Sequence, residues 1–510
     1  MLHFTMRRCG ALARDRKGNV AILFGLALIP IALAVGIATD YGQALAVRSR
    51  MVDAADAAAL AVGSWQGLTE AQMKQKAQQF FEANHSASHL GAIGQIDVIP
   101  SGDDIIVKVS GSVPTSFMKL ANVSSIDVDA QSVVTRRQRN IELALVLDTT
   151  GSMGSGGKMA AMQTAAKKMV DNLFGEGNAS DTLKISVVPF SGAVNVGDQY
   201  KNASWIDKNG KSKPAFEDFK KSEGVKVFDL IDDMKNEKWS GCVRERVGNA
   251  FELTDYTPTT SRANSLFAPY FAPDEPDSDH DDGYNYNNSY IDDGDCGTSK
   301  ESKRTPAKCQ KYTGKYDGAQ VYSSSKGPDL NCPPRAITPL TDTKSTVVSA
   351  INALQPKGYT VIPAGLLWGW RVLSPGAPFT EGKPYDEEKW IKAIVLLTDG
   401  QNEVGGGAYN HNKSDYNAFG YAAKGHLGNN SGTETKQELN AKTQTVCGNI
   451  KAQGILIYTI GFKVYDSTTQ NLLRNCATEP DMYFNSPSNS QLSAIFKDIA
   501  QGLSELRIAQ

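Results

Sequence analysis

The pattern of apolar and polar residues first indicates a long amino-terminal helix. Val20–Ala38 is an uncharged, apolar run of 19 residues, which as a helix is just long enough to cross the roughly 30 Å hydrocarbon layer of a membrane. Pro30 lies inside this run, and membrane helices tolerate proline better than soluble ones do. Gln43–Val62 contains much alanine and neither glycine nor proline. We therefore expect the helix to continue well beyond the apolar run.

A second helix and three strands are predicted before residue 138. Thr69 and Gln72 form a capping-box pattern at the start of a helix that ends near Asn84. Beyond it, apolar and polar residues alternate as in half-buried strands, with a turn at Ser101-Gly102-Asp103. The alternating apolar positions are Ile96 and Val98, then Ile105, Val107 and Val109, and then Ile126, Val128 and Ala130. Residues 40–138 therefore predict a stalk helix and a small α+β module.

From residue 139 onward, buried strands alternate with helices, which is the pattern of an α/β domain with a mainly parallel sheet. The predicted strands are Leu143–Leu147, Leu183–Val188, Ile391–Leu397 and Ile455–Ile460. The predicted helices are one with the apolar face Met159, Met162, Ala166, Met169 and Leu173, followed by Leu340–Leu354, Ile362–Leu373, Glu434–Gln453 and Gln491–Leu506.

The alternation stops between about Ala193 and Arg335, in a stretch rich in Asp, Asn, Tyr, Gly and Pro. A structureless loop of this length would be unusual in a compact domain, so we expect a stapled subdomain or a recognition loop. Gly405–Gly432 is a second polar excursion, directly after a predicted strand.

Charges around the apolar run predict its orientation. Five basic residues precede the run and Asp40 follows it; they are Arg7, Arg8, Arg14, Arg16 and Lys17. The positive-inside rule then makes residues 1–18 a cytoplasmic tail and residues 19–39 a membrane helix, and exports the rest. A cleaved signal peptide is the alternative, but its apolar core would be only about 7–15 residues long. We favour an uncleaved anchor.

The cysteines agree with this topology. Cys9 lies on the predicted cytoplasmic side, and an even number lies beyond the membrane, where disulfides are permitted: Cys242, Cys296, Cys309, Cys332, Cys447 and Cys476. Separation along the chain groups Cys447 with Cys476 and leaves the other four to staple the insertion, without fixing their pairing. Reduced, buried thiols are the alternative. A zinc site is disfavoured because no CxxC spacing occurs.

Charge and histidine content exclude two classes of function. The chain has 53 basic and 55 acidic side chains and no long basic run, so we do not expect it to bind nucleic acid. Its six histidines form no HExxH pattern, which argues against a zincin-type hydrolase. Because no nucleophile, base and positioned acid can be assembled from the sequence, we expect no enzyme activity.

A loop of oxygen-bearing side chains follows the first strand of the α/β domain. In Asp148-Thr149-Thr150-Gly151-Ser152 a carboxylate and two hydroxyls stand at alternate positions, at the edge of the sheet where a small divalent cation can bind. An Asx-type turn that closes the strand is the alternative. Thr360 begins a later helix and Asp399 ends another buried strand, so three loops supply oxygens.

These three loops resemble the metal-ion-dependent adhesion site of von Willebrand factor A domains. The resemblance implies a doubly wound, mainly parallel sheet over residues 139–510, with a large insertion at about 193–335. It also implies that Mg²⁺ or Mn²⁺ is bound by five residues, with an acidic group of the partner completing the octahedron. The implied ligands are Asp148, Thr150, Ser152, Thr360 and Asp399. Thr150 stands where the family usually has serine and keeps the hydroxyl.

The amino-terminal segment resembles TadE/TadG-like proteins of the tight-adherence (Flp) pilus system. The residues that carry this resemblance are Gly18-Asn19-Val20-Ala21, the apolar run with Pro30, Asp40-Tyr41 and the alanine-rich segment Asp53–Ala61. Leu23 stands where type IV prepilins carry glutamate, so we do not expect pilin-type processing.

Together, the two resemblances imply a non-enzymatic, single-pass protein of the bacterial inner membrane with its bulk in the periplasm. It would bind a protein partner, a pilus or envelope component with an acidic ligand residue, in pilus assembly or anchoring. An adhesin that binds a surface ligand through the same metal is the alternative.

Pro273–Cys296 is rich in aspartate and offers a second candidate cation site. Asp277-x-Asp279-x-Asp281 begins like a calcium loop. However, Gly283 falls one place late for an EF-hand, and Asn288 stands where glutamate would close the loop. We therefore favour a solvated acidic loop and keep Ca²⁺ as the alternative.

Overall fold

The computed structural model divides into two compact units, residues 1–138 with the last three residues, and residues 139–507. We call them the amino-terminal and carboxyl-terminal units and describe each by itself. The structure describes residues 17–65, 68–84, 92–101, 104–135, 139–219, 225–248, 250–277, 283–323, 325–407, 409–428 and 432–506. Several residues that matter for topology and for the acidic stretch lie outside these ranges; they are Arg7, Arg8, Cys9, Arg14, Arg16, Gly102, Asp103, Asp279, Asp281 and Asp282.

A helix of 47 residues, α2 (Lys17–Gly63), is the spine of the amino-terminal unit. It runs through Pro30 without interruption, as expected for the predicted anchor and stalk. Small side chains at helical spacing let the outer half of α2 lie close against the sheet; these are Ala44, Ala54, Ala55, Ala58 and Ala59, all buried. The second helix, α3 (Glu70–Asn84), begins at the predicted capping box, where the Thr69 amide donates to Gln72 Oε1 at 2.9 Å.

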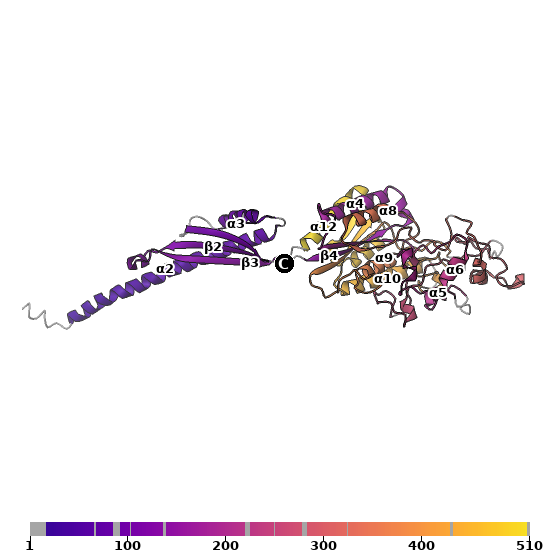
Figure 1. Ribbon diagram of the computed structural model, residues 1–510, viewed down its shortest axis with the longest axis horizontal. Helices are drawn as coiled ribbons and strands as arrows, with labels where there is room; N and C mark the ends of the chain where they lie inside the picture. The colour runs from indigo at the N-terminus through magenta and orange to yellow at the C-terminus, as the bar shows by residue number, and fades with distance from the viewer. Residues whose placement is uncertain are drawn as a thin grey trace, which may run out of the picture. The chain divides into compact units, whose positions relative to one another are not determined.

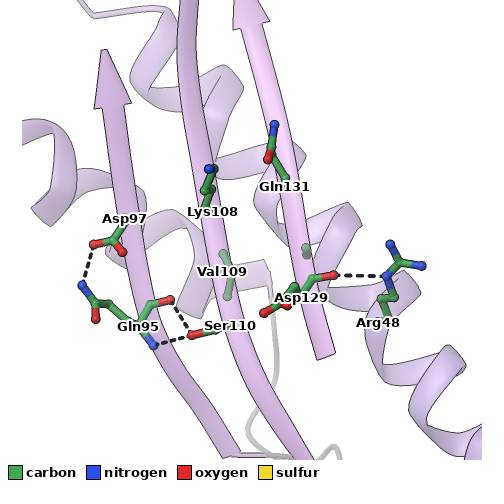
Figure 2. Close-up of a pocket in the computed structure, with 9 residues that line it drawn as sticks. Arg48, Gln95, Asp97, Lys108, Val109, Ser110, Asp129 and Gln131 are labelled. Atoms are coloured by element: carbon green, nitrogen blue, oxygen red, sulfur yellow. Dashed lines mark hydrogen bonds between the residues drawn. The ribbon is translucent and has the colours of Figure 1, made fainter. Parts of the chain in front are cut away.

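Three antiparallel strands complete the amino-terminal unit: β1 (Ala92–Ser101), β2 (Asp104–Pro114) and β3 (Ser125–Thr135). Alternate residues such as Val107 and Val109 face α2 and are buried, which confirms the period-two pattern of the sequence. The polar residues between them line an open hollow of about 520 Å³ on the other face (Figure 2), among them Lys108, Ser110 and Gln131.

The carboxyl-terminal unit is built on one mixed sheet of order β11-β10-β9-β4-β5-β6-β7, with β8 also paired to β5. Five strands are parallel: β4 (Asn140–Asp148), β5 (Leu183–Phe190), β9 (Trp390–Thr398), β10 (Leu456–Phe462) and β11 (Tyr483–Ser486). Three short strands make antiparallel pairs: β6 (Val194–Asn195) with β5, β7 (Cys242–Val243) with β6, and β8 (Thr338–Thr341) with β5. The predicted mainly parallel sheet is confirmed.

Helices cover both faces of this sheet (Figure 1). On one face lie α4 (Lys158–Phe174), α8 (Lys344–Ala353) and α12 (Asn489–Leu506); on the other lie α9 (Ile362–Leu373), α10 (Gly432–Ala452) and α11 (Ser467–Cys476). The central strand β4 serves both layers, because Leu145 faces the first and Val146 the second. Gly369 lets α9 approach the sheet, since a Cβ there would lie 2.4 Å from Val146.

The sequence patterns miss or misplace some elements of this unit. The helix predicted over Leu340–Leu354 begins only at Lys344, because Thr338–Thr341 pair with β5 as β8. Neither α11 nor β11 was predicted, since both are short and mostly polar.

The insertion folds back onto the core instead of standing apart. Its short helices are α5 (Lys213–Phe216), α6 (Val227–Asp233) and α7 (Pro306–Gln310). Its buried aromatic residues, such as Phe267 and Tyr290, share one hydrophobic cluster with Trp368 of α9. Tyr416 and Phe419 of the second polar excursion belong to the same cluster.

Three disulfides confirm the predicted grouping of the six cysteines that follow the apolar run. Cys447 pairs with Cys476, and the insertion holds Cys242–Cys332 and Cys296–Cys309. The alternative of reduced thiols is therefore wrong. Cys242 lies in β7, which pairs with β6 at the start of the insertion, and Cys332 lies near the insertion's end. The bond therefore joins the sheet extension to the end of the insertion.

Removing the Cys242–Cys332 bond should destabilise the carboxyl-terminal unit more than removing the Cys296–Cys309 bond. The two bonds span 90 and 13 residues, and the constraint on the unfolded chain grows with the loop, from about 3 kcal/mol for the shorter to about 5 kcal/mol for the longer. Urea unfolding of a 139–510 fragment carrying each double Cys→Ala change measures both effects. An equal loss, or the reverse order, would contradict the assignment of the longer bond as the main staple.

Candidate metal centre

Two aspartates meet at the carboxyl edge of the parallel sheet. Strands β4 and β9 are neighbours in register, with Leu147 opposite Leu397, so Asp148 at the end of β4 lies beside the chain that continues into Asp399. The Asp399 amide lies 3.4 Å from Asp148 Oδ2, and the Thr398 hydroxyl donates to the same oxygen at 2.7 Å. Strand pairing alone therefore brings together two residues 251 positions apart.

The hydroxyls of the first loop join the two carboxylates. The Thr150 amide and hydroxyl both donate to Asp148 Oδ1, at 2.8 and 2.6 Å. Thr150 Oγ1 lies 3.0 Å from Ser152 Oγ, which donates to Asp399 Oδ1 at 2.6 Å. Four of the five residues predicted from the sequence thus form one continuous chain of oxygens.

Thr360 lies on a loop that packs directly against the first loop. The Gly151 amide donates to the Gly358 carbonyl and the Lys357 amide donates to the Thr149 carbonyl, each at 2.8 Å. The Thr360 side chain is nearly buried, but among the described residues its hydroxyl makes no hydrogen bond to the other four predicted ligands. The structure therefore places the third loop beside the site without joining its hydroxyl to the oxygen chain.

The two carboxylates of the site are buried from solvent, and burial shifts the pKa of one of them. Burial, followed by the negative charge of Asp399, raises the pKa of Asp148 to about 6, against the opposing hydrogen bonds from Thr150 and Thr398. Lys158, at the start of α4, places its ammonium 2.7 Å from Asp399 Oδ2. A single lysine therefore faces two buried acids.

Two residues of this centre were missed by the sequence analysis. Thr398 could have been noticed because it is the last residue of strand β9 and directly precedes Asp399. Its hydroxyl lies at the edge of the site and donates to Asp148. Lys158 gives no such signal, since a basic residue in the first turn of a helix is usually solvated, and only the reach of its long side chain brings it to Asp399.

The donor set fits a small, hard divalent cation. Such ions take carboxylate and hydroxyl oxygens, and the four connected residues offer both from loops held by the sheet. Within the described part of the chain, no group of three or more His, Cys, Asp or Glu side chains is arranged to hold a metal ion. A cation here would consequently depend on the Thr150 and Ser152 hydroxyls as well as on the two carboxylates.

The described part of the acidic stretch, residues 273–277 and 283–296, is more buried than the solvated loop that its composition predicts. Asp274 and Asp293 are buried, and Lys315 Nζ bridges them at 2.7 and 2.5 Å. The amides of Asp277 and Asp293 each donate to the other residue's carboxylate, at 2.9 and 2.8 Å. Among the described acidic residues of this stretch, Asp292 and Asp295 are exposed. A lysine ammonium supplies the positive charge between Asp274 and Asp293. The calcium alternative rests on Asp277, Asp279 and Asp281, and the last two lie outside the described residues.

Comparison with known protein families finds a match, and it lies at the amino-terminal end of the chain. A family model described as "Putative Flp pilus-assembly TadE/G-like" matches residues 18–66. No curated protein matches the sequence.

Solved structures resemble the chain with low scores. They include the vWF domain of the type V pili tip protein Mfa5 from Porphyromonas gingivalis, with 12% identity and a TM-score of 0.34 over 73% of this chain and 97% of that one. The pilus adhesin SpaC from Lactobacillus rhamnosus GG has 12% identity and a TM-score of 0.33, over 81% of this chain and 34% of that one. A von Willebrand factor type A protein from Catenulispora acidiphila has 12% identity and a TM-score of 0.28, over 80% of this chain and 49% of that one. The fold is assigned from the strand order and the loop geometry of this chain, and not from these similarities.

Without metal, the carboxyl-terminal unit should lose stability as the pH rises through the pKa of Asp148. The folded-state pKa of about 6 lies above the value near 4 in an unfolded chain, so folding favours the protonated acid. The penalty begins near pH 4, is complete above pH 6, and amounts to about 1–2 kcal/mol between pH 5 and pH 7.5.

Urea unfolding of the 139–510 fragment in EDTA measures this change. Asp148→Asn should remove that part of the pH dependence, whereas Asp292→Asn, which alters an exposed acid, should leave it in place. A pH dependence that is identical in the parent and Asp148→Asn would show that the pKa of Asp148 is not raised by folding.

Proposed function

We propose that this TadG-like chain, which joins a TadE/G-like segment to a von Willebrand factor A fold, is a single-pass membrane protein that grips a protein partner through a divalent cation during assembly or anchoring of a Flp pilus. The observation that carries the proposal is the oxygen chain from Asp148 to Asp399 at the edge of the sheet. The proposed role is binding and not catalysis.

The amino-terminal helix supports the membrane part of the proposal. The part of α2 from Ile22 to Gly63 contains an 18-residue window with a mean hydropathy of 2.5, of which only 6% is buried within the structure. Side chains such as Phe24 and Ile29 are exposed, as lipid contact requires. The basic residues that precede the run give the proposed orientation, with the amino terminus in the cytoplasm and the rest in the periplasm of a bacterium with an inner membrane.

Mg²⁺ or Mn²⁺ is the proposed ion. Asp148 and Asp399 would supply charge, directly or through water, and Thr150 and Ser152 would supply hydroxyl oxygens. Thr360 remains a proposed ligand because its loop is hydrogen-bonded to the first loop. Once bound, the ion would offer an open coordination position to an acidic side chain of the partner.

We further propose that the insertion helps to select that partner. Lys357, three residues before Thr360, forms an ion pair of 3.1 Å with Asp329 near the end of the insertion. Tyr359 hydrogen-bonds to Asp415 in the second polar excursion. A partner that reaches the metal would therefore meet both irregular segments next to it. The membrane helix favours a partner in the cell envelope over the alternative of an adhesin that binds a surface ligand.

Mg²⁺ should bind the 139–510 fragment, and Asp148→Asn and Asp399→Asn should each abolish binding, because each removes one of the two charges that hold the ion. Isothermal titration calorimetry with MgCl₂ measures this, in an oxidised fragment so that the disulfides are intact. Asp292→Asn is the matched control, since it removes an exposed acid of the insertion. Binding of equal strength in the parent and both site variants would refute the proposed metal centre.

A further inference from the structure

The loop between β2 and β3, residues 115–124, presents apolar side chains to its surroundings. Leu120 is 79% exposed and Phe117 is 46% exposed, and Val123 is exposed beside them. The loop contains no acidic residue, and Lys119 is its only charged side chain. Exposed apolar residues that cluster at one tip indicate a contact surface more often than residues scattered singly do.

Asp40 of α2 holds this loop against the helix. Its carboxylate accepts hydrogen bonds from three consecutive loop amides, those of Ser116, Phe117 and Met118, at 3.0, 2.8 and 2.7 Å. The Phe117 side chain packs on Gly36, where an added Cβ would lie only 2.6 Å from it. Figure 1 shows this end of β2 and β3 alongside α2, where the helix leaves the sheet. The loop is therefore fixed at a defined height on α2.

The loop contacts α2 close to the point where the apolar run Val20–Ala38 ends. Gly36 lies two residues inside the end of Val20–Ala38, which is about 3 Å along a helix. The whole run is only about 28 Å long as a helix, so it needs nearly its full length to cross a hydrocarbon layer of roughly 30 Å. If the run spans the bilayer, the loop has little room to stand clear of the membrane surface.

We propose that residues 115–124 insert Phe117 and Leu120 into the head-group region of the same bilayer that α2 crosses, while Lys119 meets lipid phosphates. This inference rests on the proposed membrane anchor and adds a second contact to it. An exposed apolar tip with one basic residue suits the boundary between acyl chains and head groups. With two contacts, the sheet of the amino-terminal unit is held at a fixed rotation above the membrane, which a single helix does not achieve.

Photocrosslinking in vesicles tests the proposal. The full chain would be reconstituted in phosphatidylethanolamine and phosphatidylglycerol with p-benzoylphenylalanine placed at Leu120, at Ile29 or at Val133, and lipid adducts would be measured by mass spectrometry. Ile29 is an exposed residue within the apolar run, and Val133 is an exposed residue of β3 away from the loop. The expected result is lipid adducts at Leu120 and Ile29, several-fold more abundant than at Val133.

The other outcomes separate this inference from the anchor. Adducts at Ile29 with none above the Val133 level at Leu120 would overturn the loop contact and leave the anchor standing. A protein adduct instead of a lipid adduct at Leu120 would also overturn it. No adduct at Ile29 would remove the anchor, and the loop contact with it.

A second pair of variants tests the role of Asp40. Asp40→Ala removes the acceptor for the three loop amides and should lower the lipid adduct at Leu120 several-fold, with the adduct at Ile29 unchanged. Asp53→Ala, which alters an exposed acid on the same helix, should change neither. An undiminished Leu120 adduct in Asp40→Ala would show that Asp40 does not hold the loop at the membrane.

Discussion

The carboxyl-terminal unit depends on the cost of burying two carboxylates side by side. Asp148 and Asp399 follow two neighbouring parallel strands, so the sheet itself forces them together. Buried acids must be hydrogen-bonded or neutralised, and here Thr150, Thr398 and Ser152 donate hydrogen bonds while Lys158 provides one positive charge. One lysine against two acids leaves a net negative site, which is the setting that the proposed divalent cation would need.

The rest of the chain gives this negative site its setting. The insertion and the second polar excursion contribute aromatic side chains to the same core as α9, and they contact the loop that carries Thr360 through Lys357 and Tyr359. The insertion, the second polar excursion and α9, which follows the Thr360 loop, therefore share one hydrophobic core. In the amino-terminal unit, α2 combines an apolar run with an alanine-rich face that packs on the sheet, so a single helix serves as both proposed anchor and stalk.

The sequence predicted those features that follow from periodicity and from strand ends. Asp148 and Asp399 could be placed together because the carboxyl ends of parallel strands meet at one edge. The direction of the Thr360 hydroxyl could not be predicted, since the start of a helix does not fix it. The burial of Asp274 and Asp293 was missed because their partner Lys315 lies more than 20 residues away, and disulfide pairing in the insertion likewise depends on tertiary contacts alone.

A crystal structure of the 139–510 fragment grown with MnCl₂ would show whether the proposed centre holds a cation, because Mn²⁺ is located by its anomalous scattering independently of any binding model. We expect one strong peak bounded by Asp148, Thr150, Ser152 and Asp399, at oxygen distances of about 2.0–2.3 Å, with Lys158 displaced from Asp399 Oδ2. A map without a peak there, with the 2.7 Å contact between Lys158 and Asp399 intact, would contradict the proposed centre.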